Sequence, residues 1–144
     1  MDKIVFVCTG NTCRSPMAEG LFRALGGEEK TGLTASSAGV FTVDDLSASD
    51  FAVAAAEELG ADIKAHRSRM LTAEIVEGAR YLVCMTAAHY DRVLELFPQA
   101  AGKVFTLASN DICDPYGGDL DTYRGCALDL KRGVSAVMQR LLEA

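Results

Sequence analysis

Short apolar runs alternate along this chain with longer amphipathic segments, and this alternation constrains the fold more than any other feature. The apolar runs cover residues 3–8, 34–40, 81–85 and 104–107, and their lengths are typical of buried strands. Segments with helical spacing lie between and after them. Strands that alternate with helices predict a doubly wound α/β fold, in which a four-stranded parallel sheet is covered by helices on both faces.

Helix signals support this division of the chain. Ser15 is a good N-cap and Pro16 suits a first helical position, while Gly26 and Gly27 are expected to end that helix. Ser49 is a candidate N-cap for the next one. The sequence therefore predicts helices over the following ranges: 15–25, 49–59, 71–78, 86–97 and 120–142.

The length and charge of the chain limit its organisation and its partners. A length of 144 residues without an internal repeat or linker predicts a single domain over residues 1–144, and we expect a monomer. No apolar run approaches the roughly 18 residues of a membrane helix, and the N-terminus is typical of a strand rather than a signal peptide. We therefore expect a cytoplasmic protein that binds no membrane. A net charge of −6 with scattered Lys and Arg disfavours nucleic acid as a partner.

The five cysteines favour free thiols over metal or disulfide chemistry. Their number is odd, no CxxC or His-rich spacing indicates zinc, and a cytoplasmic chain keeps its thiols reduced. No metal or other cofactor is predicted. The cysteines are Cys8, Cys13, Cys84, Cys113 and Cys126.

Residues 8–14, with the sequence CTGNTCR, join the first predicted strand to the first predicted helix. Gly10 and Asn11 readily take positive φ, so this loop can curl and turn its backbone N–H groups inward as an anion nest. The start of the following helix adds its positive end, and Arg14 adds a planar fork for two phosphate oxygens. The loop therefore has the composition of a phosphate cup.

Cys8 lies at the floor of this cup. We expect the positive surroundings to depress the pKa of the thiol and to make it a nucleophile for phosphoryl transfer. The Ser15 hydroxyl can donate to the sulfur and make it a better leaving group in the second step. The alternative is a buried strand-end cysteine beside a solvated arginine, but a thiol, Gly, Asn, Arg and Ser-Pro coincide within eight residues. A Walker-type nucleotide loop is excluded because GK[ST] is missing.

At this point the sequence resembles a known family. The run VCTGNTCRSPMAEG at residues 7–20 resembles the signature of the low-molecular-weight protein phosphatases, and the resemblance extends over nearly the whole chain, through SAGV at 37–40, the segment around His66, LVCMTAAH and DPYGG at 114–118. It implies the phosphotyrosine protein phosphatase I-like fold and a phosphocysteine intermediate on Cys8. It also implies that Asp114 protonates the leaving group and then acts as base for the hydrolytic water.

The resemblance also suggests roles for supporting residues. Asn11 is expected to be held by a polar network with Ser37 and His66, and His66 has a structural role. In this family a pair such as Cys8 and Cys13 forms a reversible disulfide that protects the nucleophile, although Cys13 could equally be a small apolar residue behind the loop. His89 is interpreted as a helix-surface residue. Thr9, Gly10 and Thr12 complete the phosphate-binding loop.

One loop residue bears on the substrate. Many tyrosine phosphatases of this family resemble CxGNICR, whereas the threonine version with DP-aromatic-GG resembles bacterial protein arginine phosphatases. Thr12 places a hydroxyl on the rim of the cup, Tyr116 is the only aromatic residue before the two glycines, and the neighbouring Asp119 and Asp121 suit a guanidinium better than a phenol. We therefore expect protein phosphoarginine as substrate. Phosphotyrosine is the alternative if Thr12 is a neutral substitution for isoleucine.

Two other functions use similar features. Arsenate reductases of the same fold need two more cysteines a few residues apart; Cys84 lies where one might be, but no second cysteine follows nearby, and Cys113 and Cys126 are not spaced to replace it. A non-catalytic phosphate-binding module would lack Cys8, Arg14 or Asp114, and all three are present. The sequence therefore favours the phosphatase.

Overall fold

A four-stranded parallel sheet forms the centre of the molecule. The computed structural model describes residues 2–143, so Met1 and Ala144, the ends of the predicted domain, lie outside the described residues. The strands follow the order β2-β1-β3-β4, and every neighbouring pair is parallel. Their bounds are Lys3–Cys8 for β1, Thr34–Gly39 for β2, Ala79–Cys84 for β3 and Val104–Thr106 for β4. The predicted α/β fold with four parallel strands is confirmed.

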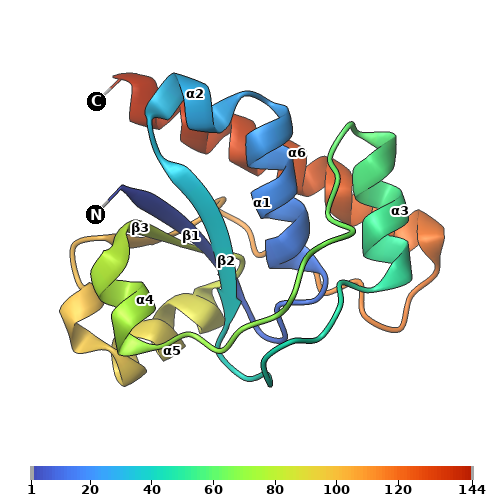
Figure 1. Cartoon of the computed structure of the whole chain (residues 1–144). Helices are drawn as coiled ribbons and strands as arrows, with labels where there is room; N and C mark the ends of the chain where they lie inside the picture. The colour runs from blue at the N-terminus through green and yellow to red at the C-terminus, as the bar shows by residue number, and fades with distance from the viewer. Residues whose placement is uncertain (1, 144) are drawn as a thin grey trace.

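Helices cover both faces of this sheet (Figure 1). One face carries α1 (Arg14–Ala24), α3 (Asp50–Glu58) and α6 (Leu120–Glu143), and the other carries α4 (Ala73–Gly78) and α5 (Ala87–Leu96). Two short elements were not predicted, α2 (Gly27–Thr31), which packs on α1 and α6, and a 3-10 helix, η1 (Pro98–Ala100). Within residues 2–143, no helix combines the length and the apolarity needed to cross a bilayer.

Side chains of the central strand alternate between the two layers. Ile4, Phe6 and Cys8 pack into the core under α1, α3 and α6, whereas Val5 and Val7 pack against the opposite helices. All five are at most 2% exposed, so both faces of β1 are buried. This alternation places the Cys8 side chain on the α1 side of the sheet.

The start of α1 differs from the prediction. The helix begins at Arg14, its N-cap residue is Cys13, and no side chain caps it, so Ser15 lies inside the first turn. The Ser15 hydroxyl instead contacts the sulfur of Cys8. Ser49, by contrast, caps α3 as predicted, because its Oγ accepts a hydrogen bond of 3.3 Å from the backbone N–H of Ala52.

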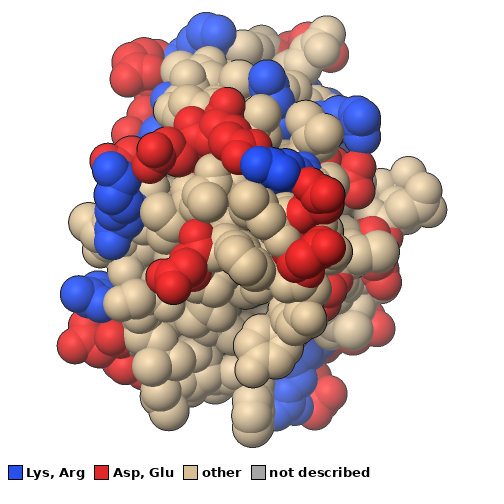
Figure 2. Space-filling view, turned by 90° about the vertical axis from the view of Figure 1, so that its right-hand side faces the viewer, with Lys and Arg blue, Asp and Glu red and all other residues tan. Residues whose placement is uncertain are grey.

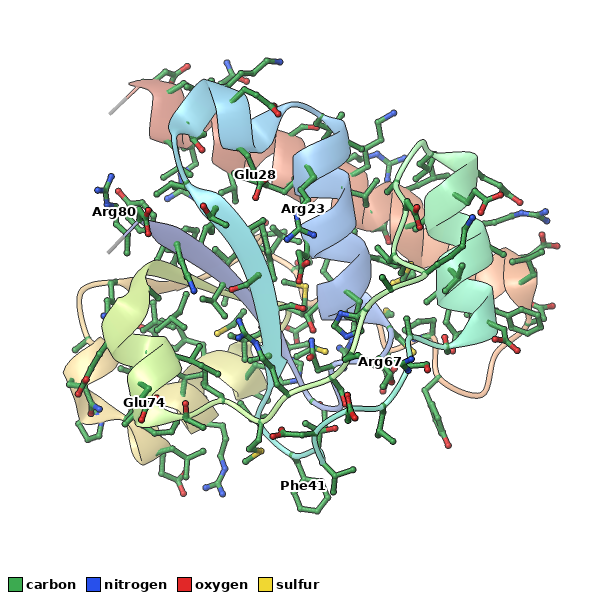
Figure 3. All side chains as sticks on the ribbon, in the orientation of Figure 1. Arg23, Glu28, Phe41, Arg67, Glu74 and Arg80 are labelled. Atoms are coloured by element: carbon green, nitrogen blue, oxygen red, sulfur yellow. The ribbon has the colours of Figure 1, made fainter. Side chains whose placement is uncertain are left out.

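The loop formed by residues 8–14, called the phosphate loop below, opens at the carboxyl edge of the sheet. It follows β1, whose neighbours β2 and β3 lie on its two sides, and such a switch point is where ligands bind in doubly wound sheets. The chain after β2 also follows this edge, since the N–H of Phe41 donates to the carbonyl oxygen of Thr9 at 3.0 Å. Figure 3 shows the Phe41 side chain pointing away from the body of the molecule there.

Candidate active site

The phosphate loop encloses a small pocket. Asn11 has a φ of +57°, which turns the loop sharply, and its backbone N–H points at the Cys8 sulfur at 3.3 Å. The pocket has a volume of about 240 Å³. It is lined by the loop together with two residues of the segment before α6: Cys8, Thr9, Gly10, Asn11, Thr12, Cys13, Arg14, Asp114 and Tyr116.

Asn11 is fixed by four hydrogen bonds beyond its contact with the sulfur. Its Nδ2 donates to Ser15 Oγ at 2.8 Å and to Ser37 Oγ at 3.0 Å. Its Oδ1 accepts from the Arg69 backbone N–H at 3.0 Å, and its carbonyl oxygen lies 2.7 Å from His66 Nε2. Burial lowers the pKa of His66, and the carbonyl partner requires that its Nε2 carry the proton. The structure thus brings Asn11, Ser37 and His66 together as expected.

The polar network continues onto α1. Ser37 Oγ donates to Glu19 Oε1 at 2.7 Å, and Glu19 pairs with Arg23 at 2.5 Å. Arg23 also lies 3.5 Å from Glu28, and Figure 3 shows these two side chains side by side. Glu19 was not predicted as part of the site; its place four residues after Ser15, on the same helix face, is the signal that could have found it.

Cys8 is 2% exposed, and its sulfur lies 2.9 Å from Ser15 Oγ. Burial raises the pKa of the Cys8 thiol, while hydrogen bonds from Ser15 and Asn11 and the charge of Arg14 lower it. The expected depressed pKa is therefore wrong for the free protein: the loop groups act in the predicted direction, but burial outweighs them. The sequence could not show how completely the strand end is covered.

Arg14 is held where its guanidinium faces the pocket. It is 6% exposed, and its Nη1 donates to the carbonyl oxygen of Ile112 at 2.9 Å. Its Nη2 lies 3.7 Å from Asp114 Oδ2. The Asp114 side chain is 55% exposed, and its Oδ1 accepts a hydrogen bond from the Tyr116 backbone N–H at 3.1 Å. One pocket is thus lined by three groups suited to phosphoryl transfer: a thiol, a guanidinium and a carboxyl group that can donate or accept a proton.

Cys13 lies behind the loop with its thiol among polar groups. Its sulfur is 3.4 Å from the Tyr123 hydroxyl and 3.5 Å from Ser49 Oγ. The residue is 6% exposed, and both Cys13 and Cys8 are free thiols. The contacts fit a packed thiol as well as one held near the nucleophile.

The predicted acidic wall is only partly present. Thr12 and Tyr116 line the pocket, but Asp119 and Asp121 do not. Asp119 accepts from the Thr122 N–H at 2.9 Å, which lowers the pKa of its carboxyl, and Asp121 pairs with Arg124 at 2.8 Å. Asp119 and Asp121 thus interact with the first turn of α6, and Asp114 is the one of the three carboxylates that lines the pocket.

His89 was wrongly interpreted as a surface residue. It is 5% exposed, and its Nε2 lies 2.8 Å from Thr9 Oγ1. Burial and, to a lesser degree, Arg14 lower the pKa of His89 to about 4. The error arose because the helical pattern alone did not show that the first turn of α5 meets the phosphate loop; the position of MTAAH directly after a central strand was the available signal.

Comparison with known proteins identifies the family. Residues 3–144 match the family described as low molecular weight phosphotyrosine protein phosphatase. The chain belongs to this family. The family and the enzyme class predicted from the sequence are thereby confirmed, and phosphorylated proteins are the substrates that the family implies.

Both protein-arginine-phosphatases and protein-tyrosine-phosphatases of the low molecular weight family are similar to this chain. The protein-arginine-phosphatase of Geobacillus stearothermophilus is 39% identical over 145 residues, which cover 96% of this chain and 95% of that protein. The probable low molecular weight protein-tyrosine-phosphatase EpsP of Ralstonia nicotianae is 33% identical over 141 residues, 96% and 94% of the two chains.

A solved structure of this family is similar over almost the whole chain. It is a mutant of the YwlE arginine phosphatase with a phosphorylated active-site serine in place of cysteine, and it superposes with a TM-score of 0.90 at 36% identity. The match covers 96% of this chain and 95% of that one.

Cys84, the candidate for an arsenate reductase thiol, lies on the wrong side of the sheet. It is fully buried in the layer under α4 and α5, whereas Cys8 faces the α1 layer. Burial raises the pKa of the Cys84 thiol to about 12. A protonated thiol across the sheet is unsuited to relay a disulfide from Cys8, which favours the phosphatase.

Proposed function

We propose that this protein is a protein phosphatase that hydrolyses phosphoarginine through a phosphocysteine intermediate on Cys8. The observation that carries the choice of arginine is the polar side chain of Thr12 in the wall of the pocket that also contains Cys8, Arg14 and Asp114. A wall with a hydroxyl group can pair with guanidinium N–H groups, which a phenol ring lacks. The Geobacillus relative named as a protein-arginine-phosphatase supports the same choice.

In the first step the phosphoryl group moves from substrate nitrogen to sulfur. The Cys8 thiol first gives its proton to water, and the resulting thiolate attacks phosphorus. The P–N bond breaks, and the electron pair stays on the guanidine nitrogen, which takes a proton from Asp114. Arg14 and the inward backbone N–H groups of the phosphate loop stabilise the equatorial oxygens. Asn11 keeps these donors in place through its contacts with Ser15 and Ser37.

In the second step water releases phosphate. Asp114, now ionised, takes a proton from the water that attacks phosphorus, the S–P bond breaks, and its electron pair returns to Cys8. The Ser15 hydroxyl, 2.9 Å from the sulfur, stabilises the departing thiolate. Because Arg14 and the loop supply the positive charge, the proposed mechanism uses no metal or other cofactor.

The cellular location and the partners of the protein are inferred from its reactive thiol and its surface charge. We propose that the protein acts as a monomer in the cytoplasm, where the Cys8 thiol stays reduced. Figure 2 shows acidic side chains interspersed with basic ones over much of the face beside α3 and α6. Together with a net charge of −6, this surface supports phosphoproteins rather than nucleic acid as partners. Cys13 is proposed as the thiol that pairs with an oxidised Cys8.

The substrate proposal is tested by initial rates on two peptides that differ only in carrying phosphoarginine or phosphotyrosine. The expected result is a larger kcat/KM on phosphoarginine, and Thr12→Ile should move the ratio of the two values toward phosphotyrosine. Thr34→Ile, the same change in an exposed threonine at the opposite end of the sheet, is the control. A wild-type preference for phosphotyrosine would contradict the proposal.

A further inference from the structure

One hydrogen bond joins the phosphate loop, which follows β1, to α5, which follows β3. His89, in the first turn of α5, lies 2.8 Å through its Nε2 from Oγ1 of Thr9, the residue directly after the nucleophile. His89 is 5% exposed, whereas Thr9 is exposed and lines the pocket. A buried imidazole thus holds a hydroxyl group that substrate can reach. The proposed chemical steps do not use this pair.

The surroundings of His89 determine which partner donates. Its Nδ1 is buried without a hydrogen-bond partner among the described residues. A buried N–H without a partner costs more than a buried nitrogen lone pair, so the proton belongs on Nε2 and Nδ1 is bare. Burial and the neighbouring Arg14 hold the pKa of His89 at about 4, which keeps the ring neutral at pH 7. His89 therefore donates, and Thr9 Oγ1 accepts.

This direction defines what Thr9 can offer in the pocket. With one lone pair engaged by His89, the Thr9 oxygen keeps a second lone pair for a substrate N–H, and its own proton is free to donate. Thr9 lines the same pocket as Thr12 and Asp114. A guanidinium presents several N–H groups in one plane, whereas a phenyl ring presents none.

We propose that Thr9 is a specificity-determining residue that accepts a hydrogen bond from the substrate guanidinium, and that His89 is the positioning residue that orients its hydroxyl. This inference rests on the proposed phosphoarginine substrate and assigns a second polar group to its recognition. A site that pairs with substrate N–H groups rejects an analogue without them, because its polar group is then left unpaired.

The test is a double-mutant cycle of Thr9→Val and His89→Leu, which remove the hydroxyl and the imidazole at similar volume. For each variant, kcat/KM is measured on matched phosphoarginine and phosphotyrosine peptides. Each single variant should lower the phosphoarginine-to-phosphotyrosine ratio about tenfold, the effect of one hydrogen bond, and the double variant should lower it no further. His89→Gln, whose amide N–H reaches similarly far, should restore most of the ratio.

Two results would overturn the inference: an unchanged ratio in either single variant, or a product of the two single effects in the double variant. An unchanged ratio with equal losses on both peptides would indicate general distortion of the phosphate loop. Thr34→Val is the matched control for loss of a threonine hydroxyl. Wild-type rates alone judge the phosphoarginine proposal, whereas the variant-to-wild-type ratios judge Thr9 and His89, so the two can fail separately. Urea unfolding of each variant confirms that it is folded.

Discussion

At the scale of single residues, Asn11 fixes the shape of the phosphate loop through both its backbone and its side chain. Its φ of +57° turns the loop, and its amide joins Ser15, Ser37 and Arg69. Glycine would keep the backbone turn and lose the amide, whereas alanine would lose both. Few residue types other than asparagine meet both needs.

We therefore expect Asn11→Gly to lower the free energy of unfolding by about 2 kcal/mol, since buried partners lose their hydrogen bonds. Asn11→Ala should cost about 1 kcal/mol more because of its positive φ. Urea denaturation of the two variants measures this difference. If alanine were as stable as glycine at this position, the left-handed turn would carry no strain. Both variants should lose most phosphatase activity.

Much of the site could be predicted at this scale from a local pattern, and the rest could not. Cys8, Arg14 and Ser15 lie within eight residues, so the strand-to-helix junction alone brings them together. His89 and the Ile112 carbonyl reach the loop from other connections, and only the order of the strands shows that they meet there. Burial of Cys8 likewise depends on the whole fold, which is why the direction of its pKa shift was missed.

At the scale of elements, α6 is positioned by close contact at one glycine. A Cβ on Gly133 would lie 2.7 Å from Leu107 Cγ, directly after β4, whereas a Cβ on Gly125 of the same helix meets nothing within 4 Å. The long helix can approach the sheet because a side chain is missing at one position.

This contrast provides a matched pair. Gly133→Ala should destabilise the protein by about 2 kcal/mol through overpacking against Leu107, while Gly125→Ala should stabilise it by about 1 kcal/mol through helix propensity. Thermal or urea unfolding of both variants shows whether each change raises or lowers the free energy of unfolding. Equal stabilisation by the two alanines would show that α6 can shift away from β4 at little cost.

Elements were predicted well where the pattern of apolar residues was clear. The central strands and α6 appear within two residues of the expected bounds because burial on both faces, or a long apolar stripe, leaves a clear pattern. The five-residue α2 was missed because Gly26 and Gly27 indicate a stop; Gly26, with a φ of +79°, ends α1 while Gly27 begins the next turn. Ser15 was predicted to cap α1, but its hydroxyl group contacts the Cys8 sulfur instead.

At the scale of the whole molecule, the fold buries thiols in both of its helical layers. Cys84 lies under α4 and α5, and Cys126, a residue of α6, is buried in the core of the opposite layer. Burial raises the pKa of each to about 12, and it also raises the pKa of Cys8. An unfolded chain ionises its thiols near 8.5. The stability that the neutral thiols provide is therefore complete below about pH 8.5 and is lost as pH rises toward 12.

The free energy of unfolding should accordingly fall by about 1.4 kcal/mol per pH unit for each buried thiol above about pH 9. Cys84→Ala should reduce that slope by one such increment even if it lowers stability at pH 7. Cys113→Ala changes a cysteine that is exposed in the folded chain, so it should leave the slope as in wild type. Identical slopes in wild type and Cys84→Ala would contradict burial of a neutral thiol at that position.

The central claim is that Cys8 accepts the phosphoryl group, and trapping the intermediate tests it most directly. Asp114→Asn, mixed with para-nitrophenyl phosphate and quenched in acid, should accumulate phosphocysteine, because this leaving group departs without an acid and the hydrolytic water has lost its base. Peptide mass spectrometry is predicted to find one phosphoryl group on the peptide containing Cys8, and none when Cys8→Ala is added, since alanine has no atom that can accept it. A phosphoryl group on Cys13, or continued turnover with Cys8 replaced, would contradict the account.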